Sequence, residues 1–232
     1  MSRRHDDKEM IIASQIAYLD FDNEAVSTGK YTIGELLDTV TDEEKKKNFQ
    51  DLIRDYPEVN SWKIRDIRNN QQSSGMYACL IETEDNEAII AFRGSESDTP
   101  GNVIRDWGLS DFGLVNNTLT PQQLTAQMYM RDIYERYGDE YSSFDVTGHS
   151  LGGNLAEHAT ITALDGMRGK IRRCVNLDGP GFSTEYIAAH ASDINKIRDN
   201  IDHYQWSVVG SLLIPIPGSN YQTVVAETPE NK

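Results

Sequence analysis

The sequence predicts an α/β fold in which helices flank a mostly parallel central sheet. After residue 120, runs typical of strands alternate with runs typical of helices, a pattern that favours parallel strands joined by crossover helices. A Gly-x-Ser-x-Gly pattern at 148–152 follows one of these strand runs and opens a helical run. The 232 residues are enough to bury a substantial core. We therefore expect one α/β domain that spans residues 1–232.

The first sixty residues predict helices, whereas strands begin near residue 61. Three helices are expected there, over residues 10–19, 32–40 and 41–56. Thr41 can cap the third of these with Glu44 three positions later, and Pro57 follows its end. We expect residues 1–60 to form an N-terminal helical cover on a core formed by residues 61–232.

The core contains regularly spaced strand and helix signals. The predicted strands are the run before Gly148 and residues 61–67, 76–82, 88–92, 172–177, 201–209 and 221–226. Polar residues 84–86 join two of them as a hairpin. Helices are expected at 120–137, 150–164 and after the capping residue Ser183. The stretch 96–118 has mixed polarity; we expect a loop with a short helix, in which residues 96–115 are a candidate lid.

The charge balance excludes some partners. Lys and Arg number 22 against 37 Asp and Glu, a formal net charge of −15. Binding to nucleic acid by phosphate neutralisation is therefore not expected. The same charge disfavours electrostatic docking on an anionic membrane, but it leaves transient apolar contact with a lipid surface open.

Leader and membrane signals are also missing from the pattern. The charged N-terminus lacks the apolar region and cleavage site of a secretory signal, and no apolar run reaches membrane-spanning length. We expect a soluble chain, either cytoplasmic or exported by a non-classical route. Cys79 and Cys174 each lie in an apolar strand run, which predicts buried free thiols instead of a disulfide or a metal site. With no metal-ligand spacing and no phosphate-binding loop, we predict no cofactor.

Ser150 is the candidate nucleophile. At the strained corner of such a strand–turn–helix unit, glycine on either side of the serine lets the backbones pass, and Gly148 and Gly152 meet that need. The N–H of Leu151 and the start of the following helix would face the negative charge that develops during acyl transfer. A second N–H donor should come from the end of another strand, where Ser95 is well placed. The structural alternative is an ordinary glycine-rich turn.

Two paired motifs carry a family resemblance. They are Phe92-Arg93-Gly94-Ser95 with Asp106-Trp107, and Gly-His-Ser-Leu-Gly-Gly at 148–153. In this order they resemble the class 3 lipases, α/β-hydrolases of the fungal triacylglycerol lipase type, and are closer still to a bacterial lipase-like group described as uncharacterised. The similarity covers most of residues 8–226. It implies that Ser95 is the oxyanion residue and that a lid lies within 96–115.

The carboxylate that would orient the catalytic histidine is assigned less directly than Ser150. Where class 3 lipases carry their aspartate, this chain has Ser207. One strand earlier, Asp178 stands at the predicted carboxyl end of the strand 172–177, as the acid of pancreatic-type lipases does, and the Asp-Gly-Pro-Gly-Phe sequence matches the bacterial group. We predict Asp178 as the acid. The structural alternative is a turn whose carboxylate caps nearby N–H groups.

The base has no clear candidate among the five histidines. His5 lies in the charged leader, and His149 lies inside the Gly-x-Ser-x-Gly motif. His158 lies along the following helix, and His190 lies at the end of a surface helix. His203 is a weak candidate, because it falls inside a strand and reads as a core or surface histidine. In the resembling bacterial group the histidine follows the last strand, so we expect either a base beyond Lys232 or an impaired enzyme.

Three functions follow from these residues. The first is a serine hydrolase that cleaves carboxylic esters, of the lipase or phospholipase kind, through an acyl-enzyme. The alternative from another class is a catalytically incomplete, hydrolase-like module that binds an acyl ligand or a protein partner. Thioesterase or peptidase chemistry would use the same machinery. The oligomeric state is left open by the sequence.

Overall fold

A computed structural model of the protein shows a seven-stranded sheet in the order β1-β2-β3-β4-β5-β6-β7. The structure describes residues 5–21, 26, 29–83, 86–94 and 119–225. The pairs β1–β2 and β2–β3 are antiparallel, and all later pairs are parallel. The strands are β1 (Lys63–Asn70), β2 (Met76–Glu82), β3 (Glu87–Phe92), β4 (Ser143–His149), β5 (Ile171–Leu177), β6 (Ile201–Gln205) and β7 (Asn220–Thr223).

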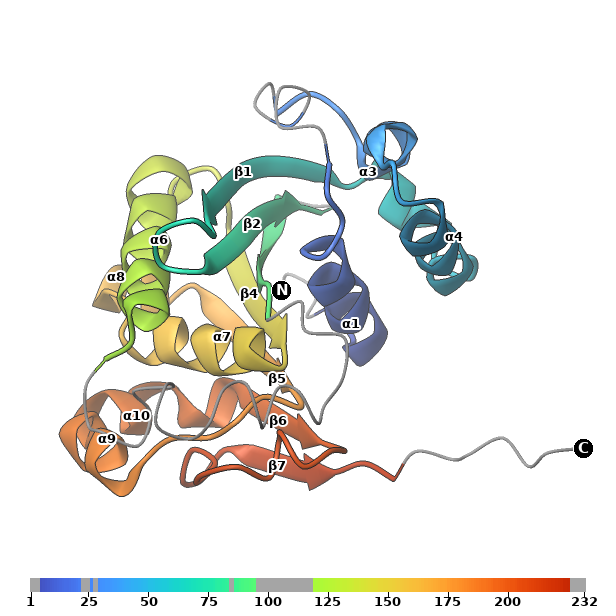
Figure 1. The fold of residues 1–232 in the computed structure, drawn as a ribbon. Coiled ribbons are helices and arrows are strands. Elements are labelled where there is room, and N and C mark those ends of the chain that lie inside the picture. The colour runs from blue at the N-terminus through green and yellow to red at the C-terminus, as the bar shows by residue number, and fades with distance from the viewer. Residues whose placement is uncertain (1–4, 22–25, 27–28, 84–85, 95–118, 226–232) are drawn as a thin grey trace, which may run out of the picture.

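Helices cover both faces of this sheet, with α1 on one face and α6 and α7 on the other (Figure 1). The α-helices are α1 (Asp7–Ile16), α3 (Ile33–Leu36), α4 (Glu43–Leu52), α6 (Pro121–Tyr137), α7 (Leu151–Ile161), α8 (Asp165–Arg168), α9 (Thr184–Ala189) and α10 (Ala191–Ile197). Short 3₁₀ helices are η1 (Leu37–Thr39), η2 (Pro57–Ser61) and η3 (Arg198–Asn200). This arrangement, with a strand–serine–helix corner at β4–α7, is an α/β-hydrolase fold.

The central strand β4 is buried on both faces, as expected of a parallel strand between helix layers. Phe144 and Val146 belong to the apolar core beneath α6 and α7. The alternate residue Thr147 faces α1 and contacts the carbonyl of Met10 at 3.4 Å. The position of Ser150 is thus set by a strand that packs on both sides.

Several sequence expectations are confirmed. Residues 76–82 form β2, and an antiparallel hairpin joins β2 to β3. Thr120 caps α6 with Pro121 in its first turn, and the Ser183 side chain caps α9. Cys79 and Cys174 are buried free thiols, and burial raises the pKa of Cys79 to about 12. The candidate lid 96–115 and Ser95 lie outside the described residues.

Several element boundaries were wrong: the helices expected at 10–19 and 41–56 are Asp7–Ile16 and Glu43–Leu52, and the strand expected at 221–226 is Asn220–Thr223. Two further differences have a clear cause. Asp42 caps α4 instead of Thr41, because the Asp42 carboxylate accepts the N–H groups of Glu44 and Lys45. The strand expected at 201–209 ends at Gln205. It ends there because the next two backbone N–H groups donate to a side chain of another strand, described below.

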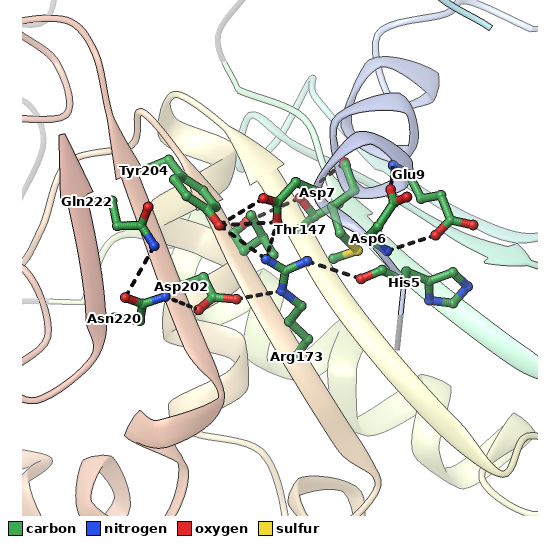
Figure 2. A network of polar contacts seen from close by, with 12 residues as sticks. His5, Asp6, Asp7, Glu9, Thr147, Arg173, Asp202, Tyr204, Asn220 and Gln222 are labelled. Atoms are coloured by element: carbon green, nitrogen blue, oxygen red, sulfur yellow. Dashed lines mark hydrogen bonds and ion pairs between the residues drawn. The ribbon is translucent and has the colours of Figure 1, made fainter. Parts of the chain in front are cut away.

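The start of α1 is attached to the middle of the sheet (Figure 2). Arg173 of β5 donates to Asp202 of β6 at 2.5 Å and also pairs with Asp7 at the first turn of α1. His5, expected in a charged leader, is buried, and its Nδ1 lies 2.7 Å from the Asp145 carboxylate of β4. The buried Arg173 guanidinium is paired with two carboxylates, which offsets the free-energy cost of removing its charge from water.

Candidate active site

The corner between β4 and α7 places Ser150 at the carboxyl edge of the sheet. Ser150 has φ 55° and ψ −132°, a backbone conformation that non-glycine residues rarely adopt. Its N–H donates to the carbonyl of Leu177 at 3.0 Å, and its carbonyl accepts the N–H of Gly153 at 2.8 Å. The strained residue is therefore held by backbone bonds on both sides, and its side chain stands at the junction of strand and helix.

The two glycines of the motif are needed for space. A Cβ on Gly148 would overlap the backbone of Gly152, and a Cβ on Gly152 would overlap the carbonyl of Phe92 at the end of β3. The obstructing atoms are backbone, which cannot move aside as a flexible side chain can. The corner thus brings β3, β4 and α7 into direct contact, as a nucleophile elbow requires.

The start of α7 supplies N–H groups beside Ser150. Leu151 is the first residue of the helix, and the first N–H groups of a helix have no partner within it. They carry the positive end of the helix dipole, which favours negative charge at this place. The N–H of Leu151 is the predicted oxyanion donor.

The end of β3 lies against the same corner. An ideal Cβ on Gly94 would be 2.5 Å from the carbonyl oxygen of His149 and 3.2 Å from Cβ of Ser150. Gly94, the last described residue before Ser95, therefore lies directly against His149 and Ser150. The predicted position of Ser95 itself is not tested, since that residue lies outside the described part of the chain.

Asp178 occupies a second strained turn, at the carboxyl end of the neighbouring strand β5. Its φ is 58°, and its side chain is buried. Its Oδ1 accepts the N–H groups of Trp206 and Ser207, each at 2.8 Å, which ends β6 early. Because both bonds use Oδ1, Oδ2 is the oxygen that could accept a proton donor such as an imidazole.

The acid turn packs on the nucleophile corner. A Cβ on Gly179 would overlap the carbonyl of Ser150 and lie 2.9 Å from the N of Asn154. The side chain of Asn176 accepts the N–H of Gly179 at 2.7 Å. The Asn154 amide donates to the carbonyls of Pro180 and Gly181, at 3.1 and 3.0 Å. The turn after β5 is thus bonded to α7 through Asn154 and to the end of β5 through Asn176, and this holds the Asp178 turn against the Ser150 corner.

All five histidines of the chain lie among the described residues. Four are engaged by side chains other than Ser150: His5 with Asp145, His158 and His190 with Tyr186, and His203 with Glu157. Burial lowers the pKa of His158 to about 3. Burial alone would lower the pKa of His203, but the adjacent Glu157 carboxylate outweighs it and raises that pKa. His203 is fully buried, so its imidazole is a core partner of Glu157.

His149 is the histidine beside the site. Its ring stacks on Trp206, with centroids 6.0 Å apart and planes 12° from parallel. Burial lowers the pKa of His149, and the Asp178 carboxylate partly offsets this shift. The ring lies on the α1 side of the corner, where the Tyr18 hydroxyl contacts its Nδ1 at 3.4 Å.

Two contacts at this edge were missed from the sequence: Arg93 was noted only as part of a motif, and Tyr18 was not noted. Arg93 is buried at the end of β3 and donates to the carbonyl of Ala17 at 2.5 Å. The Tyr18 hydroxyl accepts the N–H of Gly94 at 2.9 Å. No local sequence pattern predicts these two contacts, since each joins segments more than seventy residues apart. The sequence pattern showed the end of α1 only as part of a helical cover.

A family model for Mbeg1-like proteins matches residues 56–227, a span that includes both strained turns and the whole sheet from β1 to β7. The chain belongs to the Mbeg1-like family. This family is lipase-like, which agrees with the coarse resemblance expected from the motifs. The narrower assignment to one bacterial group is not part of that finding.

Two solved structures are similar to this Mbeg1-like chain. One is a fungal lipase–inhibitor complex, with 16% identity, a TM-score of 0.47, and coverage of 90% of this chain and 72% of that one. The other is a triacylglycerol lipase from Penicillium expansum, with 12% identity, a TM-score of 0.46, and coverage of 71% of each chain. A search of curated proteins gives no match. Within the described residues, every helix is too short or too polar to cross a bilayer.

Proposed function

We propose that this protein is a serine hydrolase that cleaves carboxylic esters through an acyl-enzyme. The observation that supports it most is the backbone of Ser150, held at φ 55° at the end of β4 with the start of α7 beside it. A non-glycine residue in that conformation costs about 1–3 kcal/mol, and such strain persists mainly where function requires it. A simple connecting turn would tolerate glycine at this position without that cost.

The roles follow from the geometry of the corner. In the proposed reaction, Ser150 Oγ attacks the acyl carbon while the base takes the hydroxyl proton, and the carbonyl oxygen becomes an oxyanion. The N–H of Leu151 and the predicted donor Ser95 stabilise that charge, while Asp178 orients and stabilises the imidazole of the base. Collapse of the tetrahedral intermediate breaks the ester C–O bond, and the alcohol leaves with the proton held by the base. Water, deprotonated by the same base, then attacks the acyl-enzyme, and the acid and the free Ser150 hydroxyl are released.

Apolar side chains near the acid support an acyl substrate. Trp206, Val208 and Ile214 follow β6 and remain 43%, 59% and 42% exposed. The first of them adjoins both Asp178 and His149. Exposed apolar surface beside a site can bind an acyl chain. We propose a lipid or other carboxylic ester as the substrate, with thioesters and peptides as comparison substrates.

A second candidate function is favoured by the histidines. Acyl transfer by serine needs a base within hydrogen-bond reach, yet all five histidines contact side chains other than Ser150, His149 included. The second candidate is a hydrolase-like module that binds an acyl ligand or a protein partner without turnover. His149 is the residue at which the two candidates can be compared, because its ring adjoins the corner.

The test is turnover of p-nitrophenyl esters of increasing acyl length by the wild type and by Ser150→Ala. Ser142→Ala is a matched control, since Ser142 is an exposed serine at the opposite end of the same strand. The hydrolase proposal expects turnover by the wild type and by Ser142→Ala, and a loss of at least about 10⁴-fold in Ser150→Ala. Turnover that survives in Ser150→Ala contradicts the proposal.

The same assay separates the two candidates. If the wild type binds a fatty acid but hydrolyses no ester, thioester or peptide, the binding module is supported. If ester turnover occurs and His149→Gln retains it, the base is another group. If His149→Gln loses turnover while its thermal stability is unchanged, the base is His149.

A further inference from the structure

The helix α1 ends beside the nucleophile corner, at the carboxyl edge of the sheet. Its last carbonyl groups need partners outside the helix, and Arg93 provides one by donating to Ala17. The Arg93 guanidinium also pairs with Asp20 at 2.9 Å and lies 4.2 Å from the ring centroid of Tyr77. Arg93 is buried, so this group of contacts fixes the end of β3 to the end of α1.

The Tyr18 hydroxyl continues this attachment into the site. It accepts the backbone N–H of Gly94 at 2.9 Å, and it contacts the carbonyl oxygen of His149 at 3.4 Å. An ideal Cβ on Gly94 would lie 2.6 Å from that hydroxyl and 3.2 Å from Cβ of Ser150. One half-buried phenol therefore lies between the strand end that precedes Ser95 and the residue that precedes Ser150.

The opposite end of α1 is attached just as firmly (Figure 2). Arg173 pairs with Asp7 in the first turn of the helix, and it also donates a hydrogen bond to the carbonyl of His5 at 3.1 Å. Asp6 and Glu9 form a reciprocal capping box, each bond 2.8 Å long. With both ends fixed, α1 can hold the Tyr18 ring in one place relative to β3 and β4.

We propose that Tyr18 is a positioning residue of the hydrolase site. Its hydroxyl holds the Gly94 amide, and hence the end of β3, in register with the Ser150 corner. This inference rests on the proposed function. A displacement of about 1 Å in a catalytic group can reduce the rate about 100-fold, so a shift of the β3 end against Ser150 should slow the reaction.

The test compares Tyr18→Phe with the wild type. The variant keeps the ring and removes only the oxygen. We expect kcat for p-nitrophenyl butyrate to fall about 10- to 100-fold with KM changed less than about threefold, because the alignment of the Ser150 corner with the end of β3 matters mainly in the transition state. A trifluoromethyl ketone, which forms a tetrahedral adduct on an active serine, should lose affinity by a similar factor.

Tyr137→Phe is the matched control. The Tyr137 hydroxyl donates to the carbonyl of Arg65 at 3.2 Å, on the α6 side of the sheet. It is also a partly buried phenol bonded to backbone, so a general loss of stability would affect both variants. We expect Tyr137→Phe to keep wild-type kcat and wild-type inhibitor affinity.

Hydrogen exchange of the Gly94 amide, followed by NMR, gives a readout that does not depend on turnover. We expect this amide to be protected in the wild type and to exchange at least about tenfold faster in Tyr18→Phe, since its acceptor is gone. An unprotected Gly94 amide in the wild type overturns the proposal even if Tyr18→Phe fails to fold.

The outcomes separate this inference from the proposed function. Unchanged kcat in Tyr18→Phe, or an equal loss in Tyr137→Phe, overturns the positioning role. If the wild type hydrolyses nothing, the proposed function and the catalytic role of Tyr18 both fail, whereas accelerated exchange of Gly94 in the variant still supports the structural contact. Loss of kcat together with faster exchange supports the whole inference.

Discussion

Polar residues at the carboxyl edge of the sheet differ from those in its interior: the former lie in strained turns, and the latter are paired with opposite charges. At the edge, Ser150 and Asp178 follow adjacent strands with φ of 55° and 58°, so both turns are strained. In the interior, Arg173 is paired with Asp202 and Asp7, and His203 is paired with Glu157. At this edge two strained turns present side chains, whereas in the interior paired charges stabilise the sheet that carries those turns.

The difference indicates how the site is kept in place. A strained turn persists only when its surroundings over-determine it. Here Asn154 and Asn176 bind the backbone of the acid turn, and the packed glycines leave no room for the corner to relax. The interior pairs should therefore affect stability, and the edge residues should affect chemistry. The following changes test that division, from the largest expected effect to the smallest.

Asp178→Asn should separate chemistry from folding. The amide oxygen can still accept the N–H groups of Trp206 and Ser207, but the negative charge that stabilises an imidazolium is lost. We expect kcat to fall on the order of 10³- to 10⁴-fold, and the free energy of unfolding in urea to change by less than about 1 kcal/mol. Asp199→Asn, at an exposed position, is the control. Wild-type kcat in Asp178→Asn would rule out its role as the acid.

Arg173→Met should have the opposite profile. Removal of the guanidinium leaves the Asp202 carboxylate buried without its cation, which costs about 3–5 kcal/mol of unfolding free energy. Arg198→Met is the matched control, because its ion pair with Asp199 is exposed and worth about 0–1 kcal/mol. Urea unfolding measures both. Similar losses in the two variants would mean that the interior pairs do not hold the sheet as described.

Low pH should reduce the free energy of unfolding through protonation of His158. Burial lowers its pKa in the folded chain to about 3, whereas the ordinary pKa of histidine is 6.5. Between these two pH values the unfolded chain binds a proton at this imidazole and the folded chain does not. The contribution of the neutral imidazole to the free energy of unfolding is therefore complete above pH 6.5 and is lost as the pH falls. The imidazole contributes a slope of about 1.4 kcal/mol per pH unit. His158→Gln should flatten the curve of unfolding free energy between pH 6 and 4; an unchanged slope would contradict the assignment.

Ser150→Gly should relieve the strain at the corner. Glycine adopts positive φ without the steric cost of a Cβ, so this variant should be about 1 kcal/mol more stable than Ser150→Ala. Both variants lack the hydroxyl, so the difference reports the relief of backbone strain less the greater entropy that glycine loses on folding, about 0.5–1 kcal/mol. Thermal or urea unfolding measures it. A Ser150→Gly variant that is less stable than Ser150→Ala by that full amount would show that the turn is not strained.

Much of the fold was predictable because local signals agree with the tertiary structure. The cap at Thr120, the strand at 76–82 and the glycines around Ser150 each act through neighbouring residues, and the structure contains them as expected. The strand after residue 201 was predicted too long. Asp178 captures the two N–H groups that would have continued the ladder, and no local pattern reveals an acceptor from another strand.

The candidate site was predictable only in part, for the same reason. Ser150 and Asp178 were proposed from motifs that each lie within a few residues of the chain. Tyr18 and the buried pair of His5 with Asp145 depend on contacts between distant segments. A helix at the N-terminus looks like a cover in the sequence, and only its contacts with Gly94 and Arg93 indicate a part in the site.

The most direct test of the account is covalent labelling of the folded protein with a fluorophosphonate, followed by mass spectrometry of the digested chain. An activated serine attacks the phosphorus and displaces fluoride, whereas ordinary serines do not react at a useful rate. The account predicts one adduct per chain, on the peptide that contains Ser150, and none on Ser150→Ala. A folded protein that takes up no probe, or carries it on another residue, would contradict the claim that Ser150 is the nucleophile.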